Sequence, residues 1–458
     1  MTTTAVATPV ATPARPAVPR GVLPVLLTAT FMTALDFFIV NVALPAVQLD
    51  LRAGPAALQW VVAGYGLALA AGLITGGRLG DLYGRRRIFG LGLALFTVAS
   101  VLCGLAPTAG LLIGARVLQG LGAAMLMPQT LAILRTAVPL WAQPKAFAQY
   151  GLTLGLGAVF GQLIGGLLIK ADLFGLDWRL CFLINLPIGI AALVKLRTLP
   201  ESRATGGRLD LVGVGLVTAA LVALVLPLIQ GPDQGWPLWT WLSLGGSAVL
   251  LAAFGVHQNR QSHPLVNLRL FRQPAFGKGL LAVQLFWMGQ ASFFLILALY
   301  LQFGQGLSAL ESGTVFMAIG AGYLFTSLNA HRFAARLGRQ VVAIGALIMV
   351  AGLVSMVFAA GHGIGWLLPG LAIDGIGMGL ALAPLTTTVL ANVEPEHTGS
   401  ASGVLSTVNQ TGNAVGVALI GIVFYQATGY TGGFQAGLIA LCVLEAALAG
   451  LVQLLPRR

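Results

Sequence analysis

Long apolar stretches alternate with short polar interruptions along almost the whole chain. A helix needs roughly 20 apolar residues to cross the hydrocarbon core of a bilayer. The pattern therefore predicts fourteen transmembrane helices, over residues 22–46, 56–77, 88–107, 110–134, 146–169, 180–198, 209–230, 237–256, 276–302, 310–329, 340–360, 364–391, 402–427 and 433–455.

The composition supports a membrane protein. Of the 458 residues, 57% are apolar and 8% are charged, against roughly 25% charged in an ordinary soluble domain. A soluble fold of this size would lack the ionic groups that keep a surface in water. The longest interruption, near 257–275, leaves no room for a soluble domain. We expect an all-α polytopic protein of the plasma membrane, with the lipid bilayer as its surroundings.

The distribution of basic residues predicts the orientation. The net charge is +12, and 21 of the 25 Lys and Arg residues fall in segments that share one side of the membrane if the N-terminus is inside. Arg52, Lys170 and Arg179 fall on the other side, and Arg116 lies inside a span. Because basic residues accumulate in cytoplasmic loops, we expect both termini to be cytoplasmic. The excess charge then sets the topology and does not indicate binding to nucleic acid.

Several function classes have no support in the sequence. The three cysteines lie in apolar stretches without metal-ligand spacing, no phosphate-binding loop is present, and no catalytic cluster is visible. We therefore expect neither an enzyme nor a cofactor or metal site, and any transport must use an ion gradient. The Thr-, Ala- and Pro-rich residues 1–21 are expected to form a disordered cytoplasmic tail.

The inner loop between the second and third spans carries the first recognisable motif. Residues 77–87 read GRLGDLYGRRR, with turn-forming glycines and one acid among four bases. A stop-transfer charge cluster is the simpler interpretation. The spacing, however, resembles the loop signature GxLaDrxGrr of the major facilitator superfamily. The resemblance implies a gating loop that includes Gly77, Asp81, Gly84, Arg85 and Arg86, in which the acid forms a latch.

Other segments resemble the fourteen-span drug:proton antiporters of that superfamily. Residues 35–45 read LDFFIVNVALP, 116–124 read RVLQGLGAA and 178–187 read WRLCFLINLP, and 398–416 resembles an inner loop of this subfamily. The resemblance implies the major facilitator fold. We expect an N-terminal six-helix bundle at 22–198, a linker with two inserted helices at 199–275, and a C-terminal six-helix bundle at 276–458.

One motif departs from the family pattern. The antiporter segment gxxxGPxxGG reads GAVFGQLIGG at residues 157–166. Its helix-packing face is predicted from Gly157, Gly161, Gly165 and Gly166, because glycines let a neighbouring helix approach closely. Gln162 replaces the proline, so the expected kink is not assured. This leaves open a metabolite carrier of another branch of the superfamily, such as a symporter.

Ionisable residues inside the spans are functional candidates, since they are costly in hydrocarbon. Asp36 lies ~21 Å into the first span, and Arg116 lies ~9 Å below the outer face of the fourth. Both are in the outer half, and the resemblance implies that their two spans line a central cavity, across which they could pair. Asp374 lies near the midplane. Proton coupling is assigned to Asp36, Arg116 and Asp374. Glu445, on a peripheral span, is expected to make a helix-packing hydrogen bond.

These residues suggest a mechanism and a substrate class. If a rearrangement separates Arg116 from Asp36, the proton affinity of the carboxyl changes, so protons and substrate would compete for one site. The resemblance places Phe37, Gln119, Gln284, Trp287 and Gln290 in the substrate cavity. Aromatic and acidic residues near the cavity favour a small lipophilic, cationic substrate. We expect a monomer that exports drugs or antibiotics. A non-transporting sensor with this fold is the remaining alternative.

Overall fold

The computed structural model describes residues 21–203, 210–261, 265, 268–329, 333, 336–390 and 398–455, and the regular structure in this part of the chain is helical. The long segments are α1 (Val22–Leu51), α2 (Pro55–Tyr83), α3 (Arg85–Gly104), α4 (Ala109–Ala137), α5 (Gln143–Ala171), α6 (Leu180–Leu183) continued by α7 (Asn185–Val194), α8 (Leu211–Gln230), α9 (Leu238–Arg260), α10 (Pro274–Leu299), α11 (Ala309–Ser327), α13 (Gln340–Ala359), α14 (Ile364–Leu390), α15 (Thr398–Gln426) and α16 (Gly429–Val452).

The predicted fourteen helices are confirmed, each overlapping the stretch expected for it. Thirteen of the helices in the described residues are long and apolar enough to cross a membrane. The other is α11, a helix of 19 residues that begins with a capping box between Ser308 and Glu311. Several helices run past the predicted ends, α1 as far as Leu51. The helix continues there although the polar residues Gln48 and Asp50 interrupt the apolar run.

Local signals explain where several helices begin. Pro55 and Pro274 occupy the first turns of α2 and α10, where the missing amide would have no helical partner. The side chain of Thr108 accepts a hydrogen bond from the Leu111 amide at the start of α4, which satisfies one of the free donors of the first turn. These residues set the helix boundaries from local sequence alone.

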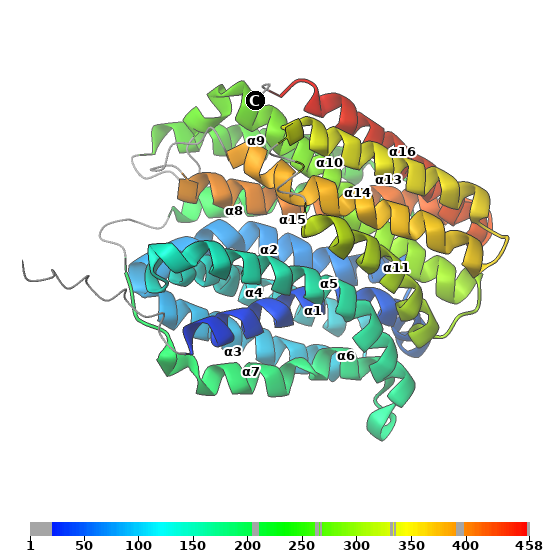
Figure 1. The fold of residues 1–458 in the computed structure, drawn as a ribbon, viewed down its shortest axis with the longest axis horizontal. Coiled ribbons are helices and arrows are strands. Elements are labelled where there is room, and N and C mark those ends of the chain that lie inside the picture. The colour runs from blue at the N-terminus through cyan, green and yellow to red at the C-terminus, as the bar shows by residue number, and fades with distance from the viewer. Residues whose placement is uncertain are drawn as a thin grey trace, which may run out of the picture.

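The helices form two bundles that use the same packing scheme. In the first, α4 packs against α2 and α3, α5 packs against α1, and α7 packs against α1 and α3. In the second, α14 packs against α11 and α13, α15 packs against α10, and α16 packs against α10 and α13. Helices α1, α4 and α7 therefore correspond to α10, α14 and α16. Figure 1 shows the first bundle in blue through cyan to the green of α7, and the second from the yellow-green of α10 to red.

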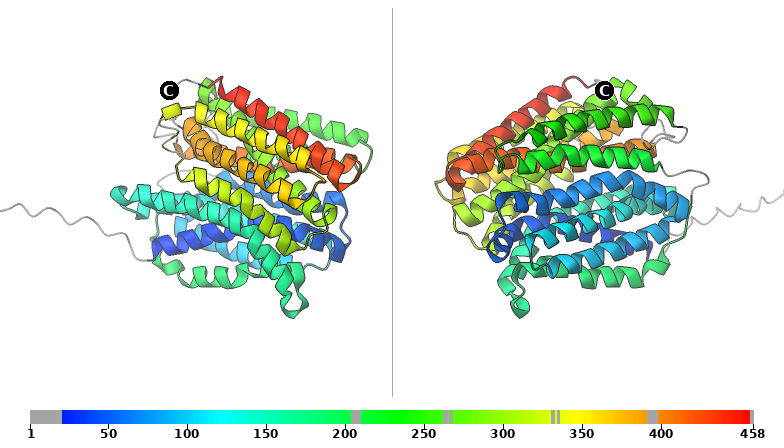
Figure 2. Two further views of the ribbon diagram at one scale, coloured as in Figure 1. Left: turned by 45° about the vertical axis from the view of Figure 1, so that its right-hand side comes forward. Right: turned by 180° about the vertical axis from the view of Figure 1, so that it is seen from behind.

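Helices α8 and α9 form a hairpin outside both bundles. Helix α8 packs against α2 and α15, one from each bundle, and α9 packs against α8. The hydroxyl groups of Ser243 and Ser247 donate to the carbonyls of Ala223 and Ala220 and join the two helices. The views in Figure 2 place this green hairpin beside the junction of the bundles. This is the insertion predicted within residues 199–275.

The two bundles meet mainly where α2 packs against α15 and α5 packs against α11, and α1 makes smaller contacts with α10 and α11. Glycines make the closest approach possible. A Cβ atom on Gly166 would lie 2.6 Å from the carbonyl oxygen of Ala309, and one on Gly313 would lie 2.6 Å from that of Gln162. The bundles are thus in direct contact in this conformation.

Both ends of the described chain lie at one end of the molecule. Helix α1 begins and α16 ends there (Figure 1), and we call it the terminal end. An even number of crossings accounts for this arrangement. That the terminal end faces the cytoplasm stays a prediction, and residues 1–20 of the expected tail lie outside the described residues.

Candidate functional site

Asp36 and Arg116 form an ion pair inside the N-terminal bundle. The Nη1 atom of Arg116, on α4, lies 2.6 Å from Oδ2 of Asp36, on α1. Both residues are 0% exposed. The expected pairing is therefore present, but it is a direct contact between packed helices and does not cross a cavity. Its part in proton coupling stays a prediction.

Two amides complete the hydrogen bonding of the Asp36 carboxylate. Its Oδ1 atom accepts from Nε2 of Gln119 at 2.7 Å and from Nδ2 of Asn185 at 2.8 Å. Ser100 accepts from both amides, at 3.0 and 2.8 Å, and donates to the carbonyl of Phe182. Four helices, α1, α3, α4 and α7, thus contribute to one polar network inside an apolar bundle.

The guanidinium of Arg116 is held on several sides. Nη1 also donates to Oε1 of Gln119 at 2.8 Å, and Nε donates to the carbonyl of Val61 at 3.0 Å. The Cζ atom lies 4.3 Å from the centre of the Tyr65 ring, a distance suited to a cation–π contact. A buried ion pair is tolerated when its remaining hydrogen-bonding groups are satisfied, and this pair largely meets that condition.

The sequence analysis did not assign Asn185, Ser100 or Tyr65 to the site. Asn185 lies in the segment 178–187, which resembles the family pattern. A polar amide in a predicted span was the sequence feature that could have assigned it to the site. Ser100 and Tyr65 are not distinguishable from ordinary helix-packing residues in the sequence. Their contribution depends on which helices become neighbours, which only the folded structure shows.

The residues of the predicted gating loop are helical in the structure, because they lie in the last turns of α2 and the first turn of α3 at the terminal end, with Gly84 between the two helices. Asp81 pairs with Arg85, one turn further along, with Oδ1 and Nη2 3.1 Å apart. The acid therefore bonds within its own loop. Gly77 faces Pro128 of α4, and a Cβ atom there would have an ordinary contact at 3.7 Å.

Glu201, which the sequence analysis did not assign, binds this loop to the segment that follows α7. Its Oε1 atom accepts from the Arg86 amide at 3.1 Å, and its Oε2 atom lies 3.7 Å from Arg86 Nε. Gly84 has a φ of 108°, and a Cβ atom there would lie 2.7 Å from the Glu201 carboxylate. Glycine is thus required at residue 84 for both backbone and space. All these contacts lie in the N-terminal bundle and in the segment that directly follows it.

The predicted cavity residues are dispersed over both bundles. Gln119 belongs to the Asp36 network. The amide of Gln284, oriented to satisfy both atoms, donates to the Val408 carbonyl at 3.0 Å and accepts from the Gly412 amide at 3.3 Å. The Trp287 ring packs edge-on against a neighbouring phenylalanine of α10. Gln290 is buried, and its Oε1 atom has no partner among the described residues.

Phe37 lies beside an aromatic contact that joins the bundles. Its ring is 5.0 Å from Phe38, which lies 5.2 Å from Phe294 of α10, and Phe294 stacks on Phe316 of α11 at 5.4 Å. The void next to Phe294 and Phe316 has a volume of about 10 Å³, enough for one water molecule at most. This part of the interface is closed in the present conformation.

The glycine motif of α5 packs as predicted. Cβ atoms on Gly157, Gly161 and Gly165 would each come within 2.5 to 3.1 Å of atoms of α1, so these glycines allow α5 and α1 to pack closely. Gly166 instead faces α11. Gln162 is buried, and both polar atoms of its amide are unpartnered among the described residues. After Pro144 in its first turn, α5 contains no proline as far as its end at Ala171.

Asp374 is not brought together with Asp36. It lies on α14 inside the C-terminal bundle, 2% exposed, and its Oδ2 atom has no hydrogen-bond partner in the described chain. Glu445, on α16, is 1% exposed, and neither of its carboxylate oxygens has a partner there. The expectation that Glu445 makes a helix-packing hydrogen bond is wrong, because it faces apolar side chains and glycine.

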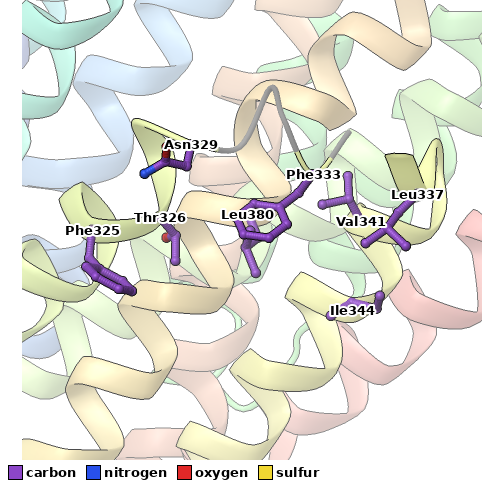
Figure 3. A pocket seen from close by; sticks show the side chains of 8 residues that line it. All are labelled: Phe325, Thr326, Asn329, Phe333, Leu337, Val341, Ile344 and Leu380. Atoms are coloured by element: carbon purple, nitrogen blue, oxygen red, sulfur yellow. The ribbon is translucent and has the colours of Figure 1, made fainter. Parts of the chain in front are cut away.

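A hollow of about 310 Å³ opens at the terminal end of the C-terminal bundle. Figure 3 shows its lining, which consists of Phe325, Thr326, Asn329, Phe333, Leu337, Val341, Ile344 and Leu380. None of the helices that carry Asp36, Arg116 or Asn185 contributes to it. It is a separate feature from the buried network.

Comparison with known proteins identifies the family. The Major Facilitator Superfamily profile matches residues 26–417. The chain belongs to the major facilitator superfamily. It is 39% identical over 424 residues to a "Probable actinorhodin transporter" of Streptomyces coelicolor, an alignment that covers 89% of this chain and 72% of that protein. It is 37% identical to "Puromycin resistance protein pur8" of Streptomyces alboniger, covering 89% and 82%, and 34% identical to "Multidrug resistance protein Stp" of Mycobacterium tuberculosis, covering 86% and 73%.

Solved structures of other major facilitator proteins share the fold. A D-xylose-proton symporter of 14% identity superposes with a TM-score of 0.70 over 96% of this chain and 98% of that one. A POT family transporter in complex with 5-aminolevulinic acid, at 16% identity, also has a TM-score of 0.70, covering 95% and 96%. The protein is thus a multi-pass major facilitator protein of the cytoplasmic membrane, in a family of transporters.

Proposed function

We propose that the protein exports a drug or antibiotic in exchange for protons, and that Asp36 is the carboxyl at which protons exchange. The relatives named as an actinorhodin transporter, a puromycin resistance protein and a multidrug resistance protein support an exporter. The single observation that carries the residue assignment is the fully buried Asp36–Arg116 pair. The proposed mechanism is transport by alternating access, without an enzymatic reaction.

The geometry suggests how exchange would work. The carboxylate of Asp36 is neutralised by Arg116, so it needs no proton while α1 and α4 stay packed as here. If these helices move apart, Asp36 loses its counter-charge, and proton binding becomes the alternative way to avoid an unpaired buried charge. Coupling then requires that the substrate and the proton favour different helix arrangements.

The aromatic contact between the bundles supports a lipophilic substrate. Phe38, Phe294 and Phe316 form a chain of rings across the interface, close to Phe37 on the helix of Asp36. When the bundles separate, these rings would line the opening, and aromatic faces bind cations as well as apolar groups. A small lipophilic, cationic compound is the substrate class we propose.

The test is transport in proteoliposomes with an imposed pH gradient, with ethidium and puromycin as probes. We expect the gradient to drive substrate movement in the natural protein and in the control Asp233→Asn, which alters an exposed loop. Asp36→Asn should abolish gradient-driven movement while substrate-for-substrate exchange persists. Unchanged gradient-driven movement in Asp36→Asn would exclude Asp36 as the exchange site, and substrate movement in the direction of the protons would indicate a symporter.

A further inference from the structure

A second pair of ionisable residues lies inside the C-terminal bundle. Asp374 on α14 and Glu445 on α16 are both at least 98% buried, and their two helices pack against the same neighbours, α10 and α13. A Cβ atom on Gly289 of α10 would lie 2.6 Å from Oε1 of Glu445. The glycine thus leaves the space that the carboxyl occupies. Helices α10 and α13 therefore lie between or beside the two helices that carry the acids.

Among the described residues, no basic side chain forms an ion pair or hydrogen bond with the unpartnered oxygens of these carboxyl groups. Helices α10, α11, α13, α14, α15 and α16 contain no histidine or arginine and one lysine, Lys278. Lys278 is exposed, and its Nζ atom donates a hydrogen bond to the Leu454 carbonyl. Leu454 lies nine residues after Glu445, a helical rise of roughly 13 Å, so Lys278 is held away from the acid. The neighbouring titratable group is the thiol of Cys442 on α16, whose electrostatics involve both acids. Glu311 on α11 is bound to Ser308 at the far end.

Hydrogen bonding does not compensate for the missing cation. Both carboxylate oxygens of Glu445 and Oδ2 of Asp374 lack a partner among the described residues. An unpaired carboxylate in an apolar interior costs several kcal/mol, and such groups take up a proton instead. A metal ion would need more oxygen ligands than two carboxyl groups supply. The described residues contain no group of three or more acidic, histidine or cysteine side chains suited to a metal.

The position of the pair repeats that of the Asp36 network. Helices α1, α4 and α7 supply Asp36, Arg116 and Asn185. Of the corresponding helices, α10 supplies Gly289, which leaves space, and α14 and α16 supply the acids Asp374 and Glu445. Both halves therefore place their buried ionisable groups among the same three helices of the repeat. The halves differ in what neutralises the carboxyl group. In the N-terminal half it is the arginine Arg116, and in the C-terminal half no side chain among the described residues takes that role.

We propose that Asp374 and Glu445 form a second proton-binding site, at which the two carboxyl groups together hold at least one proton in the closed conformation. The site is separate from the Asp36 network and lies within one bundle. Its place in the transport cycle rests on the proposed proton exchange, but proton binding itself does not, because it can be measured without any substrate.

Infrared difference spectroscopy of the purified full-length protein tests the proposal. We expect a carbonyl-stretch band of protonated carboxylic acid at neutral pH that disappears at alkaline pH. Asp374→Asn and Glu445→Gln should each remove or shift part of this band, and the remaining carboxyl should titrate at a pH changed by about one unit, because strongly interacting acids titrate as a pair. Asp233→Asn, on an exposed loop, should leave the band unchanged.

A second measurement uses the natural protein, so it is informative even if the variants fail to fold. A hydrophobic carbodiimide reacts with protonated carboxyl groups in apolar surroundings, and peptide mass spectrometry locates the adduct. We expect modification of Asp374 or Glu445 that declines as the pH is raised.

Three results would overturn the proposal: no acid band that depends on either residue, no adduct at either residue at any pH, or a band that sodium ions abolish at constant pH. The first two would show that no proton is held there, and the third would indicate a cation site. The proposed function fails separately, if the natural protein shows no gradient-driven transport although the band is present.

Discussion

The two bundles pack in the same scheme but treat a buried acid in opposite ways. In the N-terminal bundle, Asp36 receives a guanidinium and two amide donors, and each partner is itself hydrogen-bonded. In the C-terminal bundle, Asp374 and Glu445 lie in each other's vicinity without a base, and most of their oxygens are unpartnered. A repeated backbone arrangement therefore does not dictate the electrostatics of its interior. The side chains of each half decide whether a buried charge is neutralised.

This difference has consequences for stability. Removing one member of a satisfied buried ion pair leaves the other charge unpaired, whereas replacing an unsatisfied acid with an apolar residue removes an existing cost. The two sites should thus respond to substitution with opposite signs. Unfolding in mixed micelles with increasing SDS, followed by circular dichroism, measures this directly.

The largest effect is expected at Arg116. Arg116→Met leaves the Asp36 carboxylate buried without its cation, and the free energy of unfolding should fall by about 3–5 kcal/mol. The double variant Asp36→Asn with Arg116→Met should recover much of this loss, because no unpaired charge remains. The control Lys278→Met, at an exposed lysine, should change little. Equal losses in the single and double variants would contradict a charge-pairing role.

A smaller loss is expected at Asn185. Asn185→Leu removes one of the three side-chain donors to Asp36 and should lower the free energy of unfolding by about 1–3 kcal/mol. Asn413→Leu is the matched control, since Asn413 is also buried but its amide donates a 3.3 Å hydrogen bond to Oε1 of Gln410 and not to a carboxylate. If both variants lost the same amount, the Asp36 network would contribute nothing beyond ordinary amide packing.

The opposite sign is expected at Glu445. Glu445→Met replaces two unpartnered oxygens with an apolar side chain of similar length, and the free energy of unfolding should stay unchanged or rise by about 1 kcal/mol. The protonated-acid band should change in the same sample. A destabilisation as large as that of Arg116→Met would show that Glu445 has a bonding partner in the folded state.

The smallest effect is a pH dependence at the inserted hairpin, which belongs to neither bundle. Burial acts to raise the pKa of Asp210, but hydrogen bonds from His257, the Gly213 amide and Gln258 outweigh it and lower the pKa below 3.8. A lowered folded-state pKa stabilises the fold above the unfolded value, and this stabilisation is lost as the pH falls below about 3.8.

Asp210→Asn should therefore lower the thermal unfolding midpoint slightly at neutral pH, and the gap to the natural protein should close in acid. A gap that is independent of pH would mean that Asp210 acts by capping α8 alone.

The sequence predicted the fold to a large extent because one physical requirement dominates it. Apolar runs of spanning length gave all fourteen helices, and α11 was found although Glu311 lies in it. The ends of the helices were predicted less accurately. Helix α1, for example, ends at Leu51 and not at residue 46, because a helix continues past the edge of an apolar run.

The candidate site was predicted in part. The depths of Asp36 and Arg116 predicted their pairing, because both distances follow from helical rise. The spacing of Gly157, Gly161 and Gly165 predicted one packing face for the same reason. Asn185 and Glu201 were missed, since each acts on a residue more than a hundred positions away.

Residue sequence by itself determined that this chain lies in a membrane, that it folds into helices, and which few ionisable groups its interior contains. These are local properties, fixed by side-chain chemistry and helical geometry. Tertiary structure decided the partners of those groups. It placed Arg116, Gln119 and Asn185 around Asp36, and it left Glu445 against Gly289, with both carboxylate oxygens unpartnered among the described residues. Whether a buried carboxyl is neutralised by an arginine or by a proton depends on which helices become neighbours, and no stretch of sequence contains that information.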